Sequence, residues 1–275
     1  MTHGNQKKMA IINDISGFGR CSATVAIPVI SHMKIQTCLL PTSIFSNHTG
    51  YDNYFFDDYT SKMQLYADNW KKLDLRFDGI TTGFLGSITQ IEIVEKFIHD
   101  FKSSNTKVII DPVMGDNGKP YATYTKDMCD KMKKLIRYGN IITPNVTEAC
   151  ILTDTEYKGF CNKDEIKNIL LKLKDMGAEE IVLSGLSMGQ FIGNAILNKK
   201  NEFYIQKVKR VGIERAGTGD VFAAIISADC VNGVDLCSSV KKASQFVKKS
   251  IEVTEKMNVP AEDGVCFEEI LYKLS

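Results

Sequence analysis

The chain has 275 residues, of which 44% are hydrophobic, so it is long enough to bury a substantial core. Its 34 Lys and Arg residues nearly balance its 33 Asp and Glu residues, which argues against a nucleic-acid or anionic-membrane partner and favours a small-molecule one. No apolar run approaches the ~18 residues of a membrane span, and the apolar part of the N-terminus is too short for a signal peptide. We therefore expect a cytoplasmic protein.

The eight cysteines are scattered along the chain, without a C-x-x-C pair or a Cys/His cluster at zinc-ligand spacing. This pattern favours neither a disulfide framework nor a structural zinc site. Most of the cysteines are expected to be small, buried, apolar residues.

The first apolar run, residues 8–14, leads into a turn that holds Gly17 and Gly19, and a helix is expected from about Ser22. This Gly-x-Gly-x-x-Ser spacing is close to the phosphate turn of dinucleotide-binding folds. That fingerprint also needs an acidic residue about 20 positions further on, to hold the ribose hydroxyls. No carboxylate lies between Lys34 and Asp52. A plain strand-to-helix turn is therefore preferred to dinucleotide binding.

Short β-rich runs alternate with segments of helical spacing along the rest of the chain. The runs are residues 8–14, 35–41, 77–83, 106–112, 140–145 and 179–185. Helices are predicted around residues 91–101, 166–176 and 236–251, the second of them with Asn162 as its cap and Gly177 as its stop. Residues 191–197 and 202–211 flank a polar turn and predict an antiparallel hairpin. The pattern indicates an α/β fold with a mostly parallel sheet, and a single domain over residues 1–275.

The segment 215–231 places Gly217 and Gly219 on either side of Thr218, with Asp220 in the first turn of an apolar helix. Glycines let successive backbone N–H groups converge, and a helix N-terminus favours an anion such as phosphate. Asp220 is either a simple helix cap or a carboxylate that faces an attacking hydroxyl. Because the helix N-terminus lowers its pKa, we expect the position of Asp220 to matter more than its basicity. The glycine pair and the aspartate together predict a kinase.

Two further polar sites follow predicted strands. Asp111 ends a buried strand and begins a Gly-rich loop that is able to close over a nucleotide. Asn145 and Glu148 lie three apart in a first helical turn, where they either hold water ligands of Mg²⁺ or form a capping box. Ligands of open α/β sheets bind at the carboxyl ends of the strands, where all three sites fall.

Five motifs occur in the order found in one known family. They are FSNHTGY (residues 45–51), TGFLGS (82–87), DPVMGD (111–116), ITPNVTEA (142–149) and GTGDVFAA (217–224). On these motifs, which cover almost the whole chain, the sequence resembles the ribokinase-like superfamily and, within it, the pyridoxal/pyridoxamine kinases. The resemblance implies ATP-dependent phosphorylation of the 5′-hydroxymethyl group of vitamin B6. It also implies a three-layer sandwich, with helices on both faces of the sheet and a flap loop over the nucleotide site.

The resemblance also implies roles for individual residues. It makes Asp220 the catalytic base and Ala216, Gly217, Thr218 and Gly219 the anion hole. The residues implied around Mg-ATP are Asp111, Asp116, Tyr121, Thr143, Asn145, Glu148, Ser184 and Thr218, with Asp111 and Glu148 holding Mg²⁺ through water. The residues implied around the ring substrate are Asp14, Ser16, Thr49, Phe84 and Asp220. Members are commonly homodimers, often helped by a monovalent cation such as K⁺.

The first loop departs from the family pattern, because this chain has Asn13, Asp14 and ISGFGRCS where pyridoxal kinases tend to have a Ser-His pair and a longer loop. The segment DISG looks more like the related hydroxymethylpyrimidine kinases. Those relatives, however, usually carry Cys at the position of Asp220 and lack SNHTG. We therefore expect a pyridoxal kinase, with hydroxymethylpyrimidine kinase as the alternative and Asp14 within reach of the ring.

Two other classes of protein are less well supported. A nicotinamide-dependent oxidoreductase would use the first loop, and a non-catalytic vitamin B6 carrier would not need the phosphate-site glycines and Asp220. His48 is interpreted as a core or loop-bracing residue in preference to a catalytic one.

Overall fold

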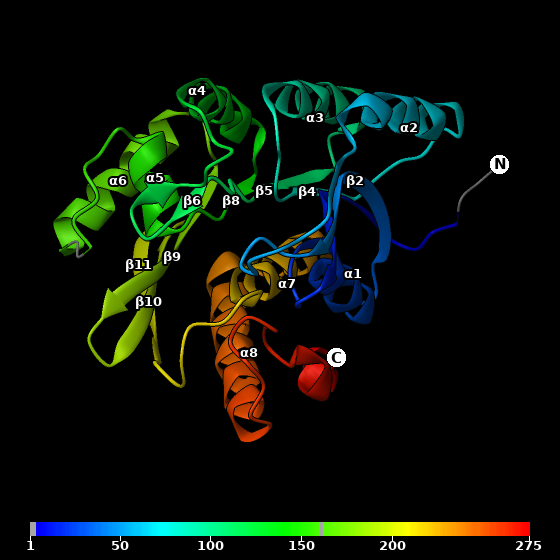
Figure 1. Ribbon diagram of the computed structural model, residues 1–275. Helices are drawn as coiled ribbons and strands as arrows, with labels where there is room; N and C mark the ends of the chain where they lie inside the picture. The colour runs from blue at the N-terminus through cyan, green and yellow to red at the C-terminus, as the bar shows by residue number, and fades with distance from the viewer. Residues whose placement is uncertain (1–3, 160–161) are drawn as a thin grey trace.

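The computed structural model describes residues 4–159 and 162–275, and it is built on a sheet of nine strands (Figure 1). The strand order is β11-β10-β9-β8-β5-β4-β1-β2-β3, in which β9 through β2 are parallel and β3, β10 and β11 pair antiparallel. The strands are β1 (Lys8–Phe18), β2 (Gln36–Asn47), β3 (Phe56–Asp58), β4 (Gly79–Thr82), β5 (Lys107–Ile110), β8 (Ile141–Ile142), β9 (Glu180–Met188), β10 (Phe191–Leu197) and β11 (Phe203–Lys209).

Helices cover both faces of the sheet. One face carries α2 (Thr60–Lys72), α3 (Ile88–Phe101), α4 (Lys126–Leu135), α5 (Val146–Leu152) and α6 (Lys163–Asp175). The other carries α1 (Ser22–His32), α7 (Thr218–Asn232), α8 (Leu236–Lys256) and the 3-10 helix η2 (Phe267–Leu274), while a short 3-10 helix η1 (Ile136–Tyr138) follows α4. Successive strand residues alternate between the two cores, so Ile12 is buried in the first and Ile11 in the second. The predicted three-layer α/β sandwich is confirmed.

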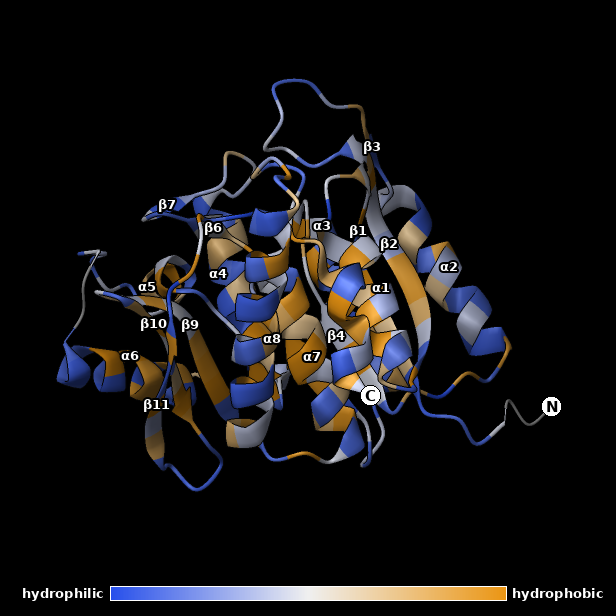
Figure 2. Cartoon of the chain, turned by 90° about the horizontal axis from the view of Figure 1, so that it is seen from below, coloured by the Kyte–Doolittle hydropathy of each residue, from blue (hydrophilic) through white to orange (hydrophobic). Residues whose placement is uncertain are grey.

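Helix α7 is apolar along most of its length, as Figure 2 shows, because it is enclosed by its neighbours. It is buried from Val221 to Asp229 and contacts α1, α8 and the strands β4 and β5. Such burial removes the amphipathic pattern expected of a surface helix. The N-terminus of α7 is therefore fixed at the carboxyl edge of the sheet.

The predicted hairpin is present as β10 and β11, and the predicted helices are α3, α6 and α8. Asn162 caps α6 by accepting hydrogen bonds from the backbone N–H groups of Asp164 and Glu165. Gly177 follows the end of that helix with a φ of 109°, which suits glycine. Local capping signals therefore located this helix correctly.

The expected turn at Gly17 is wrong, because β1 continues to Phe18 and Gly17 lies inside the strand. Only Gly19 has a left-handed backbone, with a φ of 80°. The reason is that residues 42–47 also remain extended, so β1 and β2 supply each other with hydrogen-bond partners beyond the rest of the sheet. Their register shifts between Asn13 and Ile15, where Asp14 lies opposite two residues of β2, Thr42 and Ser43.

The cysteines lie in both layers of the fold. Cys21, Cys150 and Cys266 are buried, and Cys38, Cys129, Cys230 and Cys237 are partly buried. Cys161 lies outside the described residues. Within residues 4–159 and 162–275, no helix combines the length and apolarity that crossing a bilayer requires.

Candidate active site

A cavity of about 700 Å³ opens at the carboxyl ends of β5, β8 and β9, beside the N-terminus of α7. Its remaining walls come from the segment after β11 and from α8. The predicted residues that line it are Asp111, Asp116, Tyr121, Thr143, Asn145, Glu148, Ser184, Ala216, Gly217, Thr218, Gly219 and Asp220. The fold thus brings the residues expected around a nucleotide into one space.

The first turn of α7, where the sequence predicts an anion hole, lines the cavity. Its first intrahelical hydrogen bond runs from the N–H of Val221 to the oxygen of Gly217 (2.9 Å), so the N–H groups of residues 218–220 have no partner within the helix. Gly217 has a φ of 75°, and a Cβ atom there would lie 2.0 Å from the oxygen of Arg20. Only glycine fits this position.

Ala216, which the resemblance placed in the anion hole, has an acceptor for its backbone N–H elsewhere in the fold. The N–H of Ala216 donates to the oxygen of Ala261 (3.4 Å), so it is turned toward that loop. A loop distant in sequence therefore takes up a donor that the motif alone assigned to the anion.

Asp220 is the third residue of α7 and not its cap, since Gly217 occupies the N-cap position. Burial raises the pKa of its carboxyl to about 6, and the charge of Asp14 adds to this effect, while the backbone N–H of Ser22 opposes it. The expectation of a lowered pKa is wrong because desolvation outweighs the helix N-terminus. Asp220 therefore combines a fixed position with useful basicity near neutral pH.

Asp111 follows β5 directly and accepts a hydrogen bond from the hydroxyl of Thr143 (3.0 Å). Burial raises its pKa, and the charge of Asp220 raises it further. The pKa of Glu148 is also raised, by burial and then by the charge of Asp111. The buried Glu148 and the half-buried Asp111 repel each other beside the cavity, and a bound cation would relieve this repulsion.

Glu148 and Asn145 form a capping box at the start of α5. The Oε2 atom of Glu148 accepts from the N–H of Asn145 (2.8 Å), and Oδ1 of Asn145 accepts from the N–H of Glu148 (2.9 Å). Oε1 of Glu148 also accepts from the N–H of Met114 (3.1 Å). The capping alternative is therefore present in the structure, at residues that also line the cavity.

The flap is a short hairpin of β6 (Gly115–Asp116) and β7 (Lys119–Pro120). Nδ2 of Asn145 donates to the oxygen of Gly115 (2.9 Å), and the N–H of Gly118 donates to Oγ1 of Thr147 (2.9 Å). Tyr121 follows the hairpin, lines the cavity and is exposed. The hairpin is thus joined to the first turn of α5.

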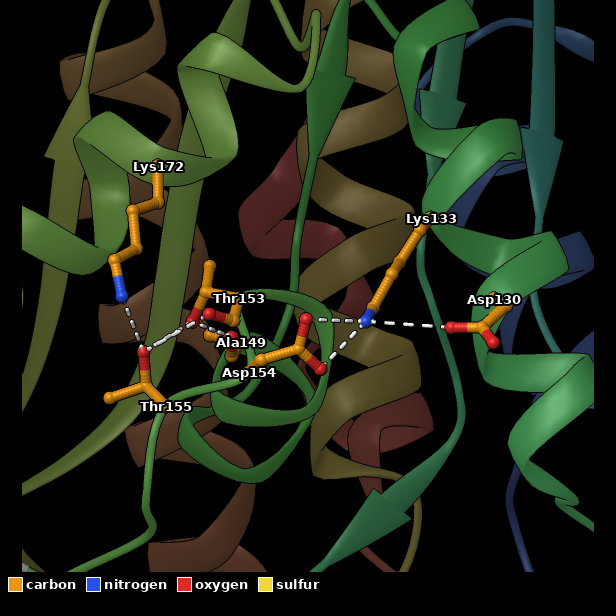
Figure 3. Close-up of polar contacts among 7 residues, drawn as sticks. All are labelled: Asp130, Lys133, Ala149, Thr153, Asp154, Thr155 and Lys172. Carbon is orange, nitrogen blue, oxygen red and sulfur yellow. Dashed lines mark hydrogen bonds and ion pairs between the residues drawn. The ribbon is translucent and has the colours of Figure 1, made fainter.

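An ion pair and a hydrogen bond hold the segment after α5 against the neighbouring helices (Figure 3). Nζ of Lys133 in α4 contacts both carboxylate oxygens of Asp154 (2.7 and 2.8 Å). Nζ of Lys172 in α6 donates to Oγ1 of Thr155 (3.2 Å). Tyr157 follows this segment, and its ring lies where a side chain on Gly118 would be. The base of the flap therefore rests on a fixed support.

Of the residues expected around the ring, Asp220 lines this cavity, whereas Asp14, Ser16, Thr49 and Phe84 lie outside its lining. Asp14 and Ser16 are both buried near the end of β1, and the hydroxyl of Ser16 donates to Oδ2 of Asp14 (3.1 Å). Burial raises the pKa of Asp14, while hydrogen bonds from Ser22 and Ser16 oppose the rise. Asp14 and Asp220 are thus neighbouring acids, one on β1 and the other on α7.

Phe84 and Thr49 belong to two different segments. The N–H of Phe84 donates to Oδ1 of Asn13 (2.9 Å), and its ring lies edge-on to that of Phe45 (6.2 Å between centroids). Thr49 lies in an exposed turn after β2. The structure places Phe84 beside the end of β1, but it shows no contact that draws Thr49 toward Asp220.

Ser22 links the two neighbouring acids, a role that the sequence did not reveal. Its hydroxyl faces Asp14 and its backbone N–H faces Asp220. Ser22 has a φ of 52°, a left-handed conformation that is costly for a residue other than glycine. Its position at the start of α1 predicted a helix boundary only.

His48 braces its loop, as interpreted from the sequence. Its Nδ1 atom accepts from the N–H of Gly50 (3.0 Å), and its Nε2 atom lies 2.7 Å from the oxygen of Glu262. This pair of contacts assigns the ring proton to Nε2.

Part of the cavity was missed by the sequence analysis. Its walls include Asn194, Phe222, Ser244, Val247 and Ile251. The sequence predicted Val247 and Ile251 only as buried residues of a helix. Apolar residues that line a ligand cavity have the same helical spacing as those that fill a core.

Similar proteins are known, and solved structures among them share this fold. A Bacteroides thetaiotaomicron protein, provisionally classed as a phosphomethylpyrimidine kinase and crystallised with pyridoxal, is 35% identical with a TM-score of 0.95, covering 98% of this chain and 96% of that one. Pyridoxal kinase from Lactobacillus plantarum is 26% identical with a TM-score of 0.91, covering 98% and 97%. The hydroxymethylpyrimidine/phosphomethylpyrimidine kinase of Aquifex aeolicus is 26% identical over 175 residues, 63% of this chain and 68% of that one.

The three-layer sandwich and the glycine-flanked helix N-terminus beside the cavity define a small-molecule kinase with a ribokinase-like fold. The sequence model of the phosphomethylpyrimidine kinase family matches residues 60–265. The chain belongs to this family, whose relatives here include both pyridoxal kinases and hydroxymethylpyrimidine kinases. Membership of this kinase family sets aside the oxidoreductase and carrier alternatives.

Proposed function

We propose that this protein transfers the γ-phosphoryl group of ATP to the 5′-hydroxymethyl group of vitamin B6, with the whole chain acting as one kinase domain. The position of Asp220 carries the proposal. It lies at one end of the nucleotide-sized cavity and is electrostatically coupled to Asp14, which stands on the side where the ring residues gather. The similar Bacteroides protein crystallised with pyridoxal supports the choice of ring.

The chemistry follows from this position. The hydroxymethyl oxygen attacks the γ-phosphorus while the bond from phosphorus to the β-phosphate oxygen breaks and ADP leaves. Asp220 accepts the hydroxyl proton, and its pKa of about 6 leaves it mostly ionised at neutral pH. The N–H groups at the start of α7 stabilise charge on the transferred group.

Mg²⁺ fits the donor set of Asp111 and Glu148, whose raised pKa values reflect carboxyls that a cation would favour in ionised form. When bound, the ion would neutralise charge on the phosphates. Within residues 4–159 and 162–275 no three acidic, His or Cys side chains converge as metal ligands. We therefore assign Asp111 and Glu148 to contacts through water, which Mg²⁺ retains readily.

Hydroxymethylpyrimidine is the second candidate substrate. The segment DISG and the similarity to the Aquifex aeolicus enzyme favour it. Asp220 and the SNHTG segment favour vitamin B6. Both substrates carry a hydroxymethyl group on a heteroaromatic ring, so the same catalytic arrangement serves either.

A coupled assay of ADP release tests the choice directly. The purified protein is assayed with pyridoxal, pyridoxamine, pyridoxine and hydroxymethylpyrimidine, with and without K⁺, at fixed Mg-ATP. We expect kcat/KM for at least one B6 vitamer to exceed that for hydroxymethylpyrimidine. The reverse order would replace the proposed substrate, and no turnover of any of the four would reject the function.

We also propose a homodimer, which the family resemblance implied. Exposed aromatic side chains lie near the edge strand β3, among them Phe55 with 65% of its surface exposed. Apolar side chains grouped in this way are typical of association surfaces. Sedimentation velocity should give a dimer for the parent and a shift toward monomer for Phe55→Ser. A parent that sediments as a monomer at micromolar concentration contradicts the proposal.

A further inference from the structure

One loop near the C-terminus, residues 259–264, touches three separate parts of the site. We call it the junction loop. It follows α8 and precedes η2, and it is tightened by hydrogen bonds from the N–H groups of Asp263 and Gly264 to the oxygens of Pro260 (3.3 Å) and Ala261 (3.3 Å). Such internal bonds let a short loop transmit a displacement instead of absorbing it.

The junction loop holds the anion end of the site through Arg215. The buried guanidinium donates from Nη1 to the oxygens of Val259 (2.7 Å) and Pro260 (3.1 Å), and from Nη2 to Oε1 of Glu255 (2.9 Å). The next residue, Ala216, donates its N–H to the oxygen of Ala261 (3.4 Å). A displacement of the phosphate-binding turn would therefore displace the junction loop through these hydrogen bonds.

The same loop holds the ring side of the site. Nε2 of His48 donates to the oxygen of Glu262 (2.7 Å), and the hydroxyl of Tyr51 donates to Oδ1 of Asp263 (2.7 Å). The rings of His48 and Tyr51 also contact each other, with centroids 4.8 Å apart. These contacts fix the segment after β2, which carries Thr49.

The first loop, the anion turn and the junction loop are closely packed where they meet. A Cβ atom on Gly217 would lie 2.0 Å from the oxygen of Arg20, and one on Gly264 would lie 2.9 Å from the Cβ of Arg20. Nη1 of Arg20 also donates to the oxygen of Asp263 (3.1 Å). Close backbone contact between the first loop, the anion turn and the junction loop makes them move together.

We propose that the junction loop couples the anion hole to the ring-binding segment, and that His48 is a positioning residue through which phosphate binding orders residues 45–56. Occupation of the anion hole then favours the arrangement that the ring substrate needs, and by linkage the ring substrate tightens nucleotide binding. The inference rests on the proposed function for its two ligands. It adds a role to His48, which touches neither ligand in this scheme.

Hydrogen exchange with mass detection tests the coupling without any turnover. The parent is measured alone and with Mg²⁺ plus adenylyl imidodiphosphate, a non-hydrolysable ATP analogue. We expect exchange to slow by about fivefold or more in peptides covering residues 215–220 and also in those covering residues 45–56. A bystander peptide in α2 should be unchanged.

Two matched substitutions separate the contacts of His48. His48→Gln keeps a donor near the Nε2 position that faces Glu262, whereas His48→Asn keeps an acceptor near the Nδ1 position that faces Gly50. We expect His48→Gln to retain protection of residues 45–56 and His48→Asn to lose it, while both retain protection of residues 215–220. Tyr51→Phe, which lacks the bond to Asp263, should show partial loss.

Each pattern of protection has a distinct meaning. Protection of residues 215–220 alone in the parent overturns the coupling and leaves nucleotide binding intact. Equal behaviour of the two His48 variants overturns the role of the bond to Glu262. Absence of protection in both segments rejects nucleotide binding, and with it the proposed function as well as the coupling. As a kinetic check, His48→Asn should raise KM for the ring substrate more than it lowers kcat.

Discussion

The predicted nucleotide side and the predicted ring side of the site each combine short-range and long-range contacts, but the contacts that left a clear signal in the sequence lie on the nucleotide side. Around the nucleotide cavity, Glu148 bonds to Asn145 three residues away, and Gly217 starts the helix that carries Asp220. On the ring side, His48 reaches Glu262 and Tyr51 reaches Asp263, across 214 and 212 positions of sequence. Contacts between residues that are close in sequence leave a recognisable motif, whereas contacts between distant segments do not. The difference explains why the sequence predicted the glycine-flanked start of α7 more sharply than the surroundings of Asp14.

The largest effect is expected at the point where the two sides meet. Asp220→Asn keeps the shape of the side chain but removes the proton acceptor, so kcat should fall by about 10²–10⁴-fold while Mg-ATP affinity is retained. The raised pKa means that folding favours the protonated form and that stability falls as pH rises from 3.8 through about 6. The variant should therefore melt no lower than the parent at pH 7.

Turnover, nucleotide affinity and melting temperature are to be measured on one preparation. Asp127→Asn, at an exposed aspartate in the first turn of α4, is the control. An Asp220→Asn protein that melts early but turns over normally would show that the carboxylate stabilises α7 only.

Glu148→Gln examines the nucleotide side alone. Because Gln offers one acceptor and one donor, it loses one of the two backbone bonds and should cost about 1–3 kcal/mol of stability. It also removes a negative charge beside the predicted cation site, so the Mg²⁺ concentration for half-maximal rate should rise about tenfold or more. Excess Mg²⁺ should then recover part of the activity. A lowered melting temperature with an unchanged Mg²⁺ requirement would leave Glu148 with capping as its only role.

The pH profile examines the acceptor itself. Since Asp220 has to be ionised to accept a proton, kcat/KM should fall about tenfold per pH unit below about 6. Near-ultraviolet circular dichroism at each pH controls for unfolding. A rate that stays level down to pH 5 in folded protein would place the essential base elsewhere.

Asp14→Ser examines the ring side and should have the smallest effect. Asp14 is a buried acid next to Asp220, and a charged hydrogen bond that its carboxylate accepts from the ring substrate would favour one vitamer over another. We expect the ratios of kcat/KM among pyridoxal, pyridoxamine and pyridoxine to change by roughly fivefold, about 1 kcal/mol. Asp127→Ser, at the exposed aspartate in the first turn of α4, is the control. Equal changes for all three vitamers would remove Asp14 from substrate selection.

The sequence predicted the layers of the fold and the nucleotide side of the site because the signals there are local. Alternating strand and helix patterns gave the sandwich, and Asn162 gave a helix start. The glycine-flanked helix N-terminus gave the anion turn. All of these depend on a few neighbouring residues, whose preferences are visible in a single sequence.

The remainder depends on contacts that a single sequence does not show. Arg215 reads as a surface charge until it is seen buried against Glu255, and Ala216 reads as a free donor until Ala261 is seen to accept its N–H. The raised pKa of Asp220 comes mainly from burial by segments far away in the chain. Ser22 shows no sign in the sequence of its left-handed backbone.

The extra residue of β2 opposite Asp14 makes this wall of the site sensitive to length as well as to identity. Removing one residue at Thr42 or Ser43 would restore regular pairing around Asp14, with Ile44 still opposite Ile15, and would remove the bend that a bulge gives to its strand. The strand end that carries Phe45 would then take a different course past Phe84 and Phe56. Point substitutions alter the wall one group at a time, whereas a deletion here moves the whole strand end. Alignments of proteins with this pocket should therefore conserve the number of residues between Leu40 and Asn47 more strictly than their identities.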